Sequence, residues 1–241
     1  MGARCVFCFE PRGLVRTGCA CRGDNAVVHV GCLSRAVIAS GSQAAWIRCR
    51  LCNQEYTGVA SCALAQKRAQ QPCTGADAFY AEVQTIDAMC ESQKSHRAEI
   101  LARALLERTA ARLGGESDEA RIVQLRLAIA LMQRGSLAEA ERLVAPVLDS
   151  APLRAQAMTM LARIMHATSR FSEAERLWRG LPGQEPSAEL VTRVLLCETL
   201  AAQGSLSASE LASVVVDARR VFGAEHSVTR KATALSWHAR A

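Results

Sequence analysis

Aromatic residues are scarce in this sequence, at 4% of 241 residues, although half of all residues are hydrophobic. Alanine, leucine and arginine dominate instead, which favours helices that pack through small and medium side chains. The sequence contains no unbroken apolar stretch of the length, about 18 residues, that a membrane-spanning helix needs. We therefore predict a chain without a membrane span.

Lysine is almost absent, since only Lys67, Lys94 and Lys231 occur among 29 basic residues. The net charge of +6 comes from arginines spread along the chain and not from a basic block, which argues against a nucleic-acid partner. The first ten residues, MGARCVFCFE, lack the apolar segment of a secretory signal. We expect a protein kept in a reducing compartment, the cytoplasm, with the nucleus as the alternative.

Cysteine, in contrast, is concentrated at the N-terminus, where seven of the eleven cysteines precede residue 53. With one histidine they form four pairs whose members are separated by one or two intervening residues: Cys5 and Cys8, Cys19 and Cys21, His29 and Cys32, and Cys49 and Cys52. A pair at this spacing can bind one tetrahedral ion from a tight turn, and two pairs complete a site. In a reducing compartment such pairs indicate zinc and not disulfides. The sequence therefore predicts two zinc ions.

Four pairs can be joined in two ways. In a tandem arrangement neighbouring pairs share an ion, whereas in a cross-braced module the first pair joins the third and the second joins the fourth. The order of ligands, four cysteines, a histidine and three further cysteines in the pattern C-C-C-C-H-C-C-C, is typical of two cross-braced families. Residues 5–58 closely resemble the RING-CH (RINGv) family in the short second pair, in the seven residues before the histidine, and in the motifs Cys21-Arg22-Gly23, Val28-His29, Cys32-Leu33 and Tyr56.

The PHD finger is the competing family. It has a wider second pair and a shorter gap to the histidine, and it prefers an aromatic residue two positions before the seventh ligand. Trp46 lies three positions before Cys49. A PHD-like reader of histone tails is therefore the weaker alternative.

The RING-CH resemblance implies both ligand sets. The first site would consist of Cys5, Cys8, His29 and Cys32, and the second of Cys19, Cys21, Cys49 and Cys52. Four protein ligands leave no open position for water, so both ions would be structural. A module of about fifty residues has too small a core to fold alone, and zinc binding would supply the folding energy.

The resemblance also implies an activity. RING-type domains dock an E2 enzyme that carries ubiquitin as a thioester and hold the pair in a reactive arrangement, which is catalysis by positioning, with no catalytic residue of their own. At the matching positions, Phe7 and Leu51 would contact the E2. Trp46 would either contribute to the same surface or anchor the loop before Cys49 in the core.

Two positions depart from the family pattern. Membrane-associated relatives carry a tryptophan four residues after the sixth ligand, where this sequence has Ala36. Many active RING domains carry a cation directly after the last ligand, where this sequence has Asn53. Both departures favour a non-enzymatic adaptor as the second hypothesis.

The rest of the chain is predicted to be helical and repetitive. A short helix and linker over residues 59–76 precede it, with Pro72 and Gly75 as breakers. Corresponding residues, most of them small or turn-forming, then recur 34 positions apart: Ala128 and Ala162, Gly135 and Ser169, Ala140 and Ala174, Val144 and Trp178, Pro152 and Pro186. A third copy, with an offset of 35, places Cys197, Gly204 and Ser209 at the first three of these positions.

This pattern resembles tetratricopeptide (TPR) repeats, in which two antiparallel helices pack through small residues and the proline ends the second helix. The phrase FGAEHSVT, residues 222–229, resembles the phrase between repeats of kinesin light chains, and LGGESDEA, residues 113–120, is a weaker match. The helix that begins at Thr229 would cap the array. TPR arrays bind peptides in a concave groove; the candidates for its lining are Gln124, Arg126, Arg163 and Arg193, which would favour an acidic partner.

We therefore predict a cross-braced two-zinc RING-CH module at residues 1–58 and an all-α TPR-like array at residues 77–241. The first functional hypothesis is an E3 ubiquitin ligase of the RING type, whose zinc module recruits an E2 and whose array binds a substrate or another partner protein.

Overall fold

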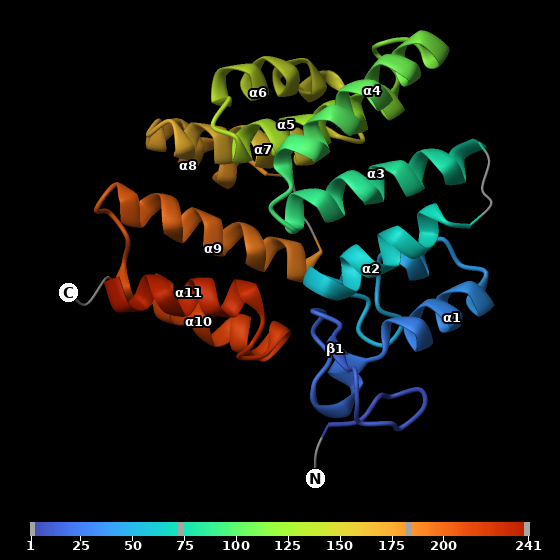
Figure 1. Cartoon of the computed structure of the whole chain (residues 1–241). Coiled ribbons are helices and arrows are strands. Elements are labelled where there is room, and N and C mark those ends of the chain that lie inside the picture. The colour runs from blue at the N-terminus through green and yellow to red at the C-terminus, as the bar shows by residue number, and fades with distance from the viewer. Residues whose placement is uncertain (1–2, 72–74, 182–184, 239–241) are drawn as a thin grey trace. The chain divides into compact units, whose positions relative to one another are not determined.

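The computed structural model describes residues 3–71, 75–181 and 185–238 (Figure 1). The chain divides into two compact units, Met1–Leu101 and Ala102–Ala241, called here the N-terminal and C-terminal units. Within the described residues, no helix combines the length and the apolar character that crossing a membrane requires.

The N-terminal unit begins with loops held by a very small sheet. Strand β1 (Val15–Arg16) pairs antiparallel with β2 (Val27–Val28), and a 3-10 turn, η1 (Gly23–Ala26), precedes β2. Helix α1 (Val30–Ser40) follows at once and ends at Gly41, whose φ of 62° is the left-handed conformation that glycine adopts without strain. A second 3-10 turn, η2 (Ala44–Trp46), leads to the last pair of cysteines.

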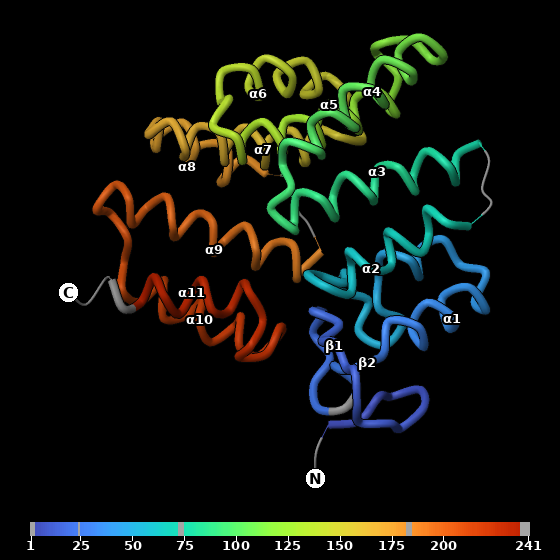
Figure 2. Tube along the Cα trace, viewed as in Figure 1, coloured from blue at the N-terminus to red at the C-terminus, as the bar shows by residue number. Residues whose placement is uncertain are grey.

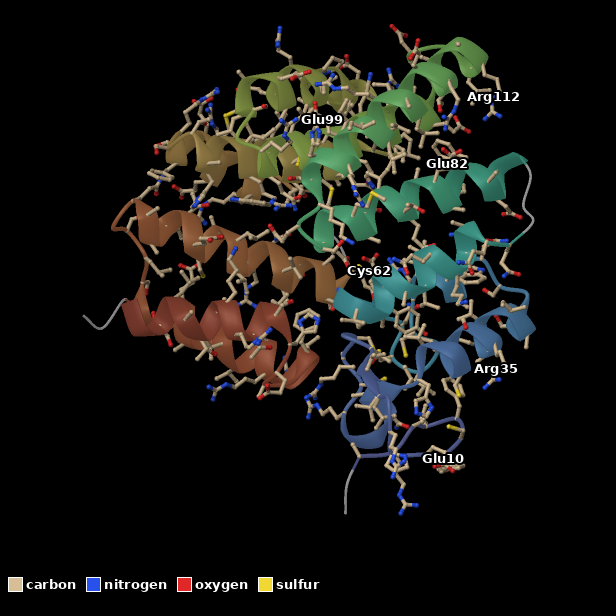
Figure 3. The ribbon with its side chains drawn as sticks, viewed as in Figure 1. Glu10, Arg35, Cys62, Glu82, Glu99 and Arg112 are labelled. Carbon is tan, nitrogen blue, oxygen red and sulfur yellow. The ribbon has the colours of Figure 1, made fainter. Side chains whose placement is uncertain are left out.

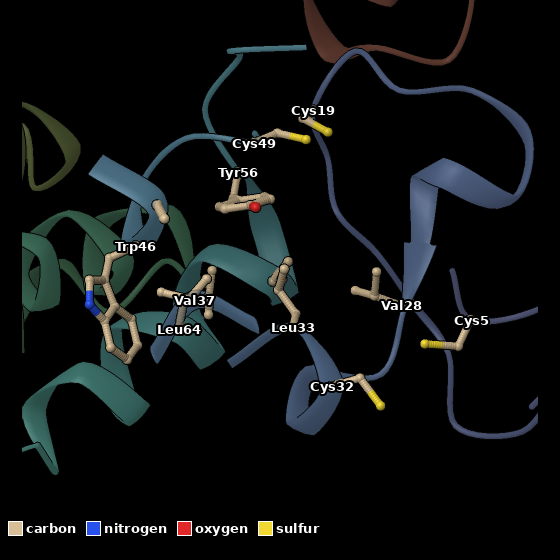
Figure 4. Packing of buried hydrophobic residues seen from close by; sticks show 12 residues of the cluster. Cys5, Cys19, Val28, Cys32, Leu33, Val37, Trp46, Cys49, Tyr56 and Leu64 are labelled. Atoms are coloured by element: carbon tan, nitrogen blue, oxygen red, sulfur yellow. The ribbon is translucent and has the colours of Figure 1, made fainter. Parts of the chain in front are cut away.

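Two further helices complete this unit. Helix α2 (Gly58–Ala69) packs against α1 and along α3 (Gly75–Glu91). Ala60 and Leu64 of α2 are fully buried in the same core as Leu33 and Val37 of α1, as Figure 4 shows for Leu33, Val37 and Leu64. Helix α2 lies within residues 59–76, the range predicted as a short helix and linker, apart from its first residue, and it covers this face of α1. Residues 72–74 of the predicted linker lie outside the described residues.

The C-terminal unit consists of successive helical pairs (Figure 2). Helix α4 (Ser95–Leu113) begins in the N-terminal unit and ends in the C-terminal unit, and it comes before the first helical pair in the chain. The elements that follow are α5 (Asp118–Gln133) with α6 (Leu137–Val144) and η3 (Ala145–Asp149), α7 (Arg154–Ala167) with α8 (Phe171–Arg179), α9 (Pro186–Ala202) with α10 (Ala208–Phe222), and α11 (Ser227–His238). The predicted all-α repeat array is confirmed.

The 34-residue period has a clear physical basis. The paired alanines at repeat positions 128, 140, 162 and 174 have no exposed surface, so they sit where two helices approach most closely. The turn between the helices of each pair contains a residue in the left-handed conformation: Gly135 (φ 81°), Ser169 (φ 60°) and Gly204 (φ 72°). Ser169 thus adopts the left-handed turn conformation that glycine adopts in the other two helical pairs.

Two details of the predicted repeat register are wrong. Ser209 is exposed, and Leu211 is the first buried residue of α10, so the third pair does not keep the small-residue position of the first two. Pro186 occupies the first turn of α9, and Pro152 lies in the turn before α7. The prolines therefore lie at or just before the start of first helices, where their missing N–H groups are not needed, instead of ending second helices.

The phrase at residues 222–229 forms the connection between α10 and α11. The ring of His226 stacks on Phe222 with centroids 4.7 Å apart, and the Thr229 hydroxyl donates a 3.0 Å hydrogen bond to the Ala218 carbonyl. Helix α11 packs on both α9 and α10 and buries Ala232, which lies 35 positions after Cys197. It therefore covers the last pair in the way that a further first helix would.

Candidate zinc centres

Folding brings the eight candidate ligands into two groups. Cys5, Cys8, His29 and Cys32 form one group, and Cys19, Cys21, Cys49 and Cys52 form the other; in each group the four ligand atoms lie within 4.8 Å of one another. The first pair thus meets the third and the second meets the fourth. The cross-braced arrangement is confirmed and the tandem arrangement is excluded.

In the first centre, the histidine presents one particular nitrogen to the sulfurs. His29 Nδ1 lies 3.1 Å from Cys8 Sγ and 3.7 Å from Cys32 Sγ, whereas Nε2 is hydrogen-bonded to the Arg12 carbonyl oxygen. Since a carbonyl can only accept, Nε2 carries the proton and Nδ1 has a free lone pair. This is the outer hydrogen bond that orients a metal-binding imidazole and selects its tautomer.

The second centre consists of sulfur alone. Cys21 Sγ and Cys49 Sγ are 3.6 Å apart, and a tetrahedral ion with zinc–sulfur bonds of about 2.3 Å separates two sulfurs by about 3.8 Å. The Thr17 hydroxyl, 3.2 Å from Cys19 Sγ, can donate to the thiolate. Both ligand sets fit zinc in donor type, number and spacing. Because each would be closed by four protein ligands, an ion there would stabilise the fold and would leave no position for a reactive water.

Burial and hydrogen bonds from neighbouring groups shift the pKa values of the candidate ligands. Burial opposes ionisation of Cys5, but the backbone N–H groups of His29, Phe7 and Cys8 lower the pKa of its thiol to about 6. Hydrogen bonding to Cys32 raises the pKa of His29, and the reciprocal bond, aided by the Arg35 guanidinium, lowers the pKa of Cys32. Hydrogen bonding from Cys19 lowers the pKa of Cys49 to about 4. The reciprocal bond to Cys49 raises the pKa of Cys19, and burial raises the pKa of Cys21, so these thiols would lose their protons only when zinc binds.

Two tight loops, each built on a C-x2-C pair, have the same backbone design. In the first loop the Phe9 N–H donates to the Cys5 carbonyl at 2.9 Å, and in the second the Asn53 N–H donates to the Cys49 carbonyl at 2.8 Å. The residue after the second cysteine is left-handed in both, with φ of 61° at Phe9 and 56° at Asn53. Asn53, which departs from the family pattern, is thus suited to its backbone conformation.

A buried polar network that the sequence did not reveal joins the helices α2 and α3 to the segment before Cys49. Arg68, which is 4% exposed, donates to the side-chain oxygens of Gln84 at 3.0 Å and Gln43 at 2.7 Å. Gln84 in turn donates to the Trp46 carbonyl at 2.8 Å. These partners lie 16 to 38 residues apart in the chain, so no local pattern could have identified them.

The three residues proposed as E2 contacts have different surroundings. The side chains of Phe7 and Leu51 are 46% and 69% exposed, one on each C-x2-C loop. Trp46 is 7% exposed and packs in the core with Val37 and Leu64 (Figure 4). It therefore occupies the position of a core anchor, the alternative role considered for it. Ala36 is half-buried on α1.

The four candidates for a partner-binding groove do not form one free surface. Arg193 is engaged, because it donates to Asp217 at 3.0 Å and to Ser213 on the neighbouring helix α10. Gln124 and Arg126 are half-buried on α5. Arg163 on α7 is exposed, yet desolvation by nearby protein atoms lowers the pKa of its guanidinium, with Glu198 acting in the opposite direction.

Comparison with known domain families supports the assignment of the zinc module. Residues 5–52 match the model of the RING-variant domain, RINGv. The matched segment contains all eight ligands of the two centres. Among curated proteins, none matches the chain significantly.

The helical part is similar to solved TPR-like structures. A Podosopora anserina protein described as a kinesin light chain with nearly identical TPR-like repeats is 21% identical, with a TM-score of 0.52, over 67% of this chain and 84% of its own. A second structure with the same description is 18% identical, with a TM-score of 0.44, over 80% of this chain and 92% of its own. At this identity the first similarity establishes the fold of the array and nothing about its partner.

Proposed function

We propose that the RING-variant domain at residues 5–52 makes this chain an E3 ubiquitin ligase, which recruits an E2 through its zinc module and a protein partner through its helical array. The observation that carries the proposal is the pair of interleaved, closed four-ligand centres, each with an exposed apolar residue on its C-x2-C loop. Two structural ions with apolar contacts beside them suit a docking module and offer no hydrolytic chemistry.

In this proposal the zinc ions only hold the two loops in place. Phe7 and Leu51 each precede the second cysteine of a pair, so the loop geometry fixes both backbones close to a ligand. They would bind apolar side chains of the E2. The reaction itself would be attack of a lysine amine on the E2 thioester, which forms an amide bond and releases the E2 thiol. The module would accelerate this step by orienting the two reactants.

The helical array would select the partner. Its first helices α5, α7 and α9 carry several arginines, of which Arg163 is both exposed and partly desolvated. Repeat arrays of this fold bind peptides along their concave side. An acidic peptide would complement this guanidinium, and removing the charge would weaken the complex most at low ionic strength.

A non-enzymatic adaptor is the second candidate, and Asn53 favours it. This residue follows the last ligand, where many active RING domains have a cation, and its amide carries no charge. In that case the zinc module would bind a protein without stimulating transfer. Asn53→Arg would then be the first substitution to test for a gain of activity.

Single-turnover discharge of ubiquitin from a panel of charged E2 enzymes onto free lysine tests the proposal. The wild type, shown by metal analysis to hold two zinc ions, should accelerate discharge from at least one E2. A His29→Ala, Cys32→Ala double variant should lose the first zinc and the acceleration together. Leu51→Ala should retain both zinc ions and still lose acceleration. A zinc-loaded wild type that stimulates no E2 would contradict the ligase and favour the adaptor.

A further inference from the structure

Phe9 is a large apolar residue of the zinc module that is exposed and has an unfavourable backbone conformation. Its side chain is 68% exposed, although it is large and apolar, and its backbone φ is 61°. A bulky residue with a left-handed backbone is a genuine outlier, because its Cβ crowds the peptide group. Its neighbours Glu10 and Pro11 are also exposed, so this side of the loop is open to solvent among the described residues of the unit (Figure 3 labels Glu10).

Folding does not require phenylalanine at this position. Backbone groups alone close the loop, since the Phe9 N–H donates to the Cys5 carbonyl and the Cys5 N–H donates to the Glu10 carbonyl. The second loop is closed in the same way at Asn53, and asparagine is a residue type that tolerates the left-handed conformation. Asparagine or glycine at position 9 would therefore serve the fold better, because the phenyl ring, in a residue that is 68% exposed, contributes little burial in exchange.

We propose that Phe9 is an E2-contact residue, which extends the docking surface of Phe7 along the first zinc loop. Local strain that no folding gain explains is concentrated at functional positions, and exposed aromatic rings are frequent anchors of protein interfaces. The inference rests on the proposed ligase function, because it takes the E2 as the occupant of this surface.

Two features favour the E2 as the occupant. Phe9 lies on the same loop as Phe7, since the two residues flank the ligand Cys8, and they are 68% and 46% exposed. The loop is also closed by two backbone hydrogen bonds and anchored by two zinc ligands, which leaves the ring only its own side-chain torsions to lose on binding. A rigid aromatic anchor of this kind binds with a small loss of conformational entropy.

The test separates binding from folding, because the two should change in opposite directions. Phe9→Asn should retain both zinc ions and have a melting temperature equal to or above that of the wild type. Its affinity for the uncharged E2 that the wild type stimulates best should fall about fivefold or more. Leu51→Ala provides the positive comparison. Val216→Asn is the matched control, since Val216 is 64% exposed on α10 and lies outside the zinc module; its E2 affinity should stay unchanged.

Several results would overturn the inference. Wild-type affinity in Phe9→Asn, with Leu51→Ala weakened, would remove Phe9 from the interface and leave the ligase proposal intact. A loss of stability equal to the loss of affinity would assign Phe9 to the fold. A defect seen only with ubiquitin-charged E2 would assign Phe9 to ubiquitin, and a loss of wild-type self-association without an effect on the E2 would assign it to a second copy of the chain. If no E2 binds the wild type, the proposed function fails, and this inference with it.

Discussion

The buried network around Gln84 provides a quantitative test of the claim that α2 and α3 belong to the zinc module. Gln84 is 7% exposed, accepts a hydrogen bond from Arg68 and donates one to the Trp46 carbonyl. Gln84→Leu keeps a side chain of similar size but removes both bonds. It leaves part of a buried guanidinium and one buried carbonyl without that partner.

The expected magnitude follows from these two losses. Each buried group that loses its partner costs about 1 to 3 kcal/mol, and the bond to the charged guanidinium lies in the upper part of that range. Since the leucine recovers some apolar burial, the net loss should be about 2 to 4 kcal/mol. For a unit of this size the melting temperature should fall by roughly 10 to 25 °C.

Thermal unfolding of the zinc-loaded full chain, followed together with hydrogen exchange of residues 42–48, measures this effect. Exchange in that segment should accelerate, because the Trp46 carbonyl and the Gln43 side chain both belong to the network. Gln66→Leu, at an exposed position on α2, is the matched control and should change stability by less than about 0.5 kcal/mol. If Gln84→Leu behaves like this control, α3 does not stabilise the zinc module and the reasoning is refuted.

Two further predictions concern self-modification and pH. If the chain modifies itself, the combined substitution of Lys67, Lys94 and Lys231 by arginine should abolish most ubiquitin attachment in a gel assay while E2 discharge onto free lysine continues; a full ladder in this variant would show that other acceptors are used. Burial lowers the pKa of His226, whose Nδ1 accepts the Val228 N–H at 3.3 Å, so its neutral form stabilises the fold at a pH above its ordinary pKa of about 6.5. That stability should be lost as the pH falls through the lowered pKa, which should appear as faster exchange of amides 218–229, corrected for intrinsic rates. His226→Asn should remove this pH dependence, and the same dependence in that variant would contradict the assignment.

The sequence alone determined the two parts of this protein that depend on local spacing. Two ligands that bind one ion from a tight turn are close in the chain, and here one or two residues separate them, so the four pairs could be recognised from the sequence. The 34-residue period was equally visible, because the closest approach of two helices admits only small residues, and Ala128 and Ala162 are indeed fully buried.

Only the tertiary structure decided which residues meet across long separations. In the structure, α2 packs in the core of the zinc module. Arg68 donates hydrogen bonds to Gln43 and Gln84, and Arg193 donates one to Asp217. Such contacts follow from the packing of whole helices, which no single spacing encodes. The backbone of Phe9 is a further case: its left-handed conformation is imposed by closure of the zinc loop and runs against the preference of its own side chain. That conflict between local preference and global fold identified a residue that the motif by itself did not.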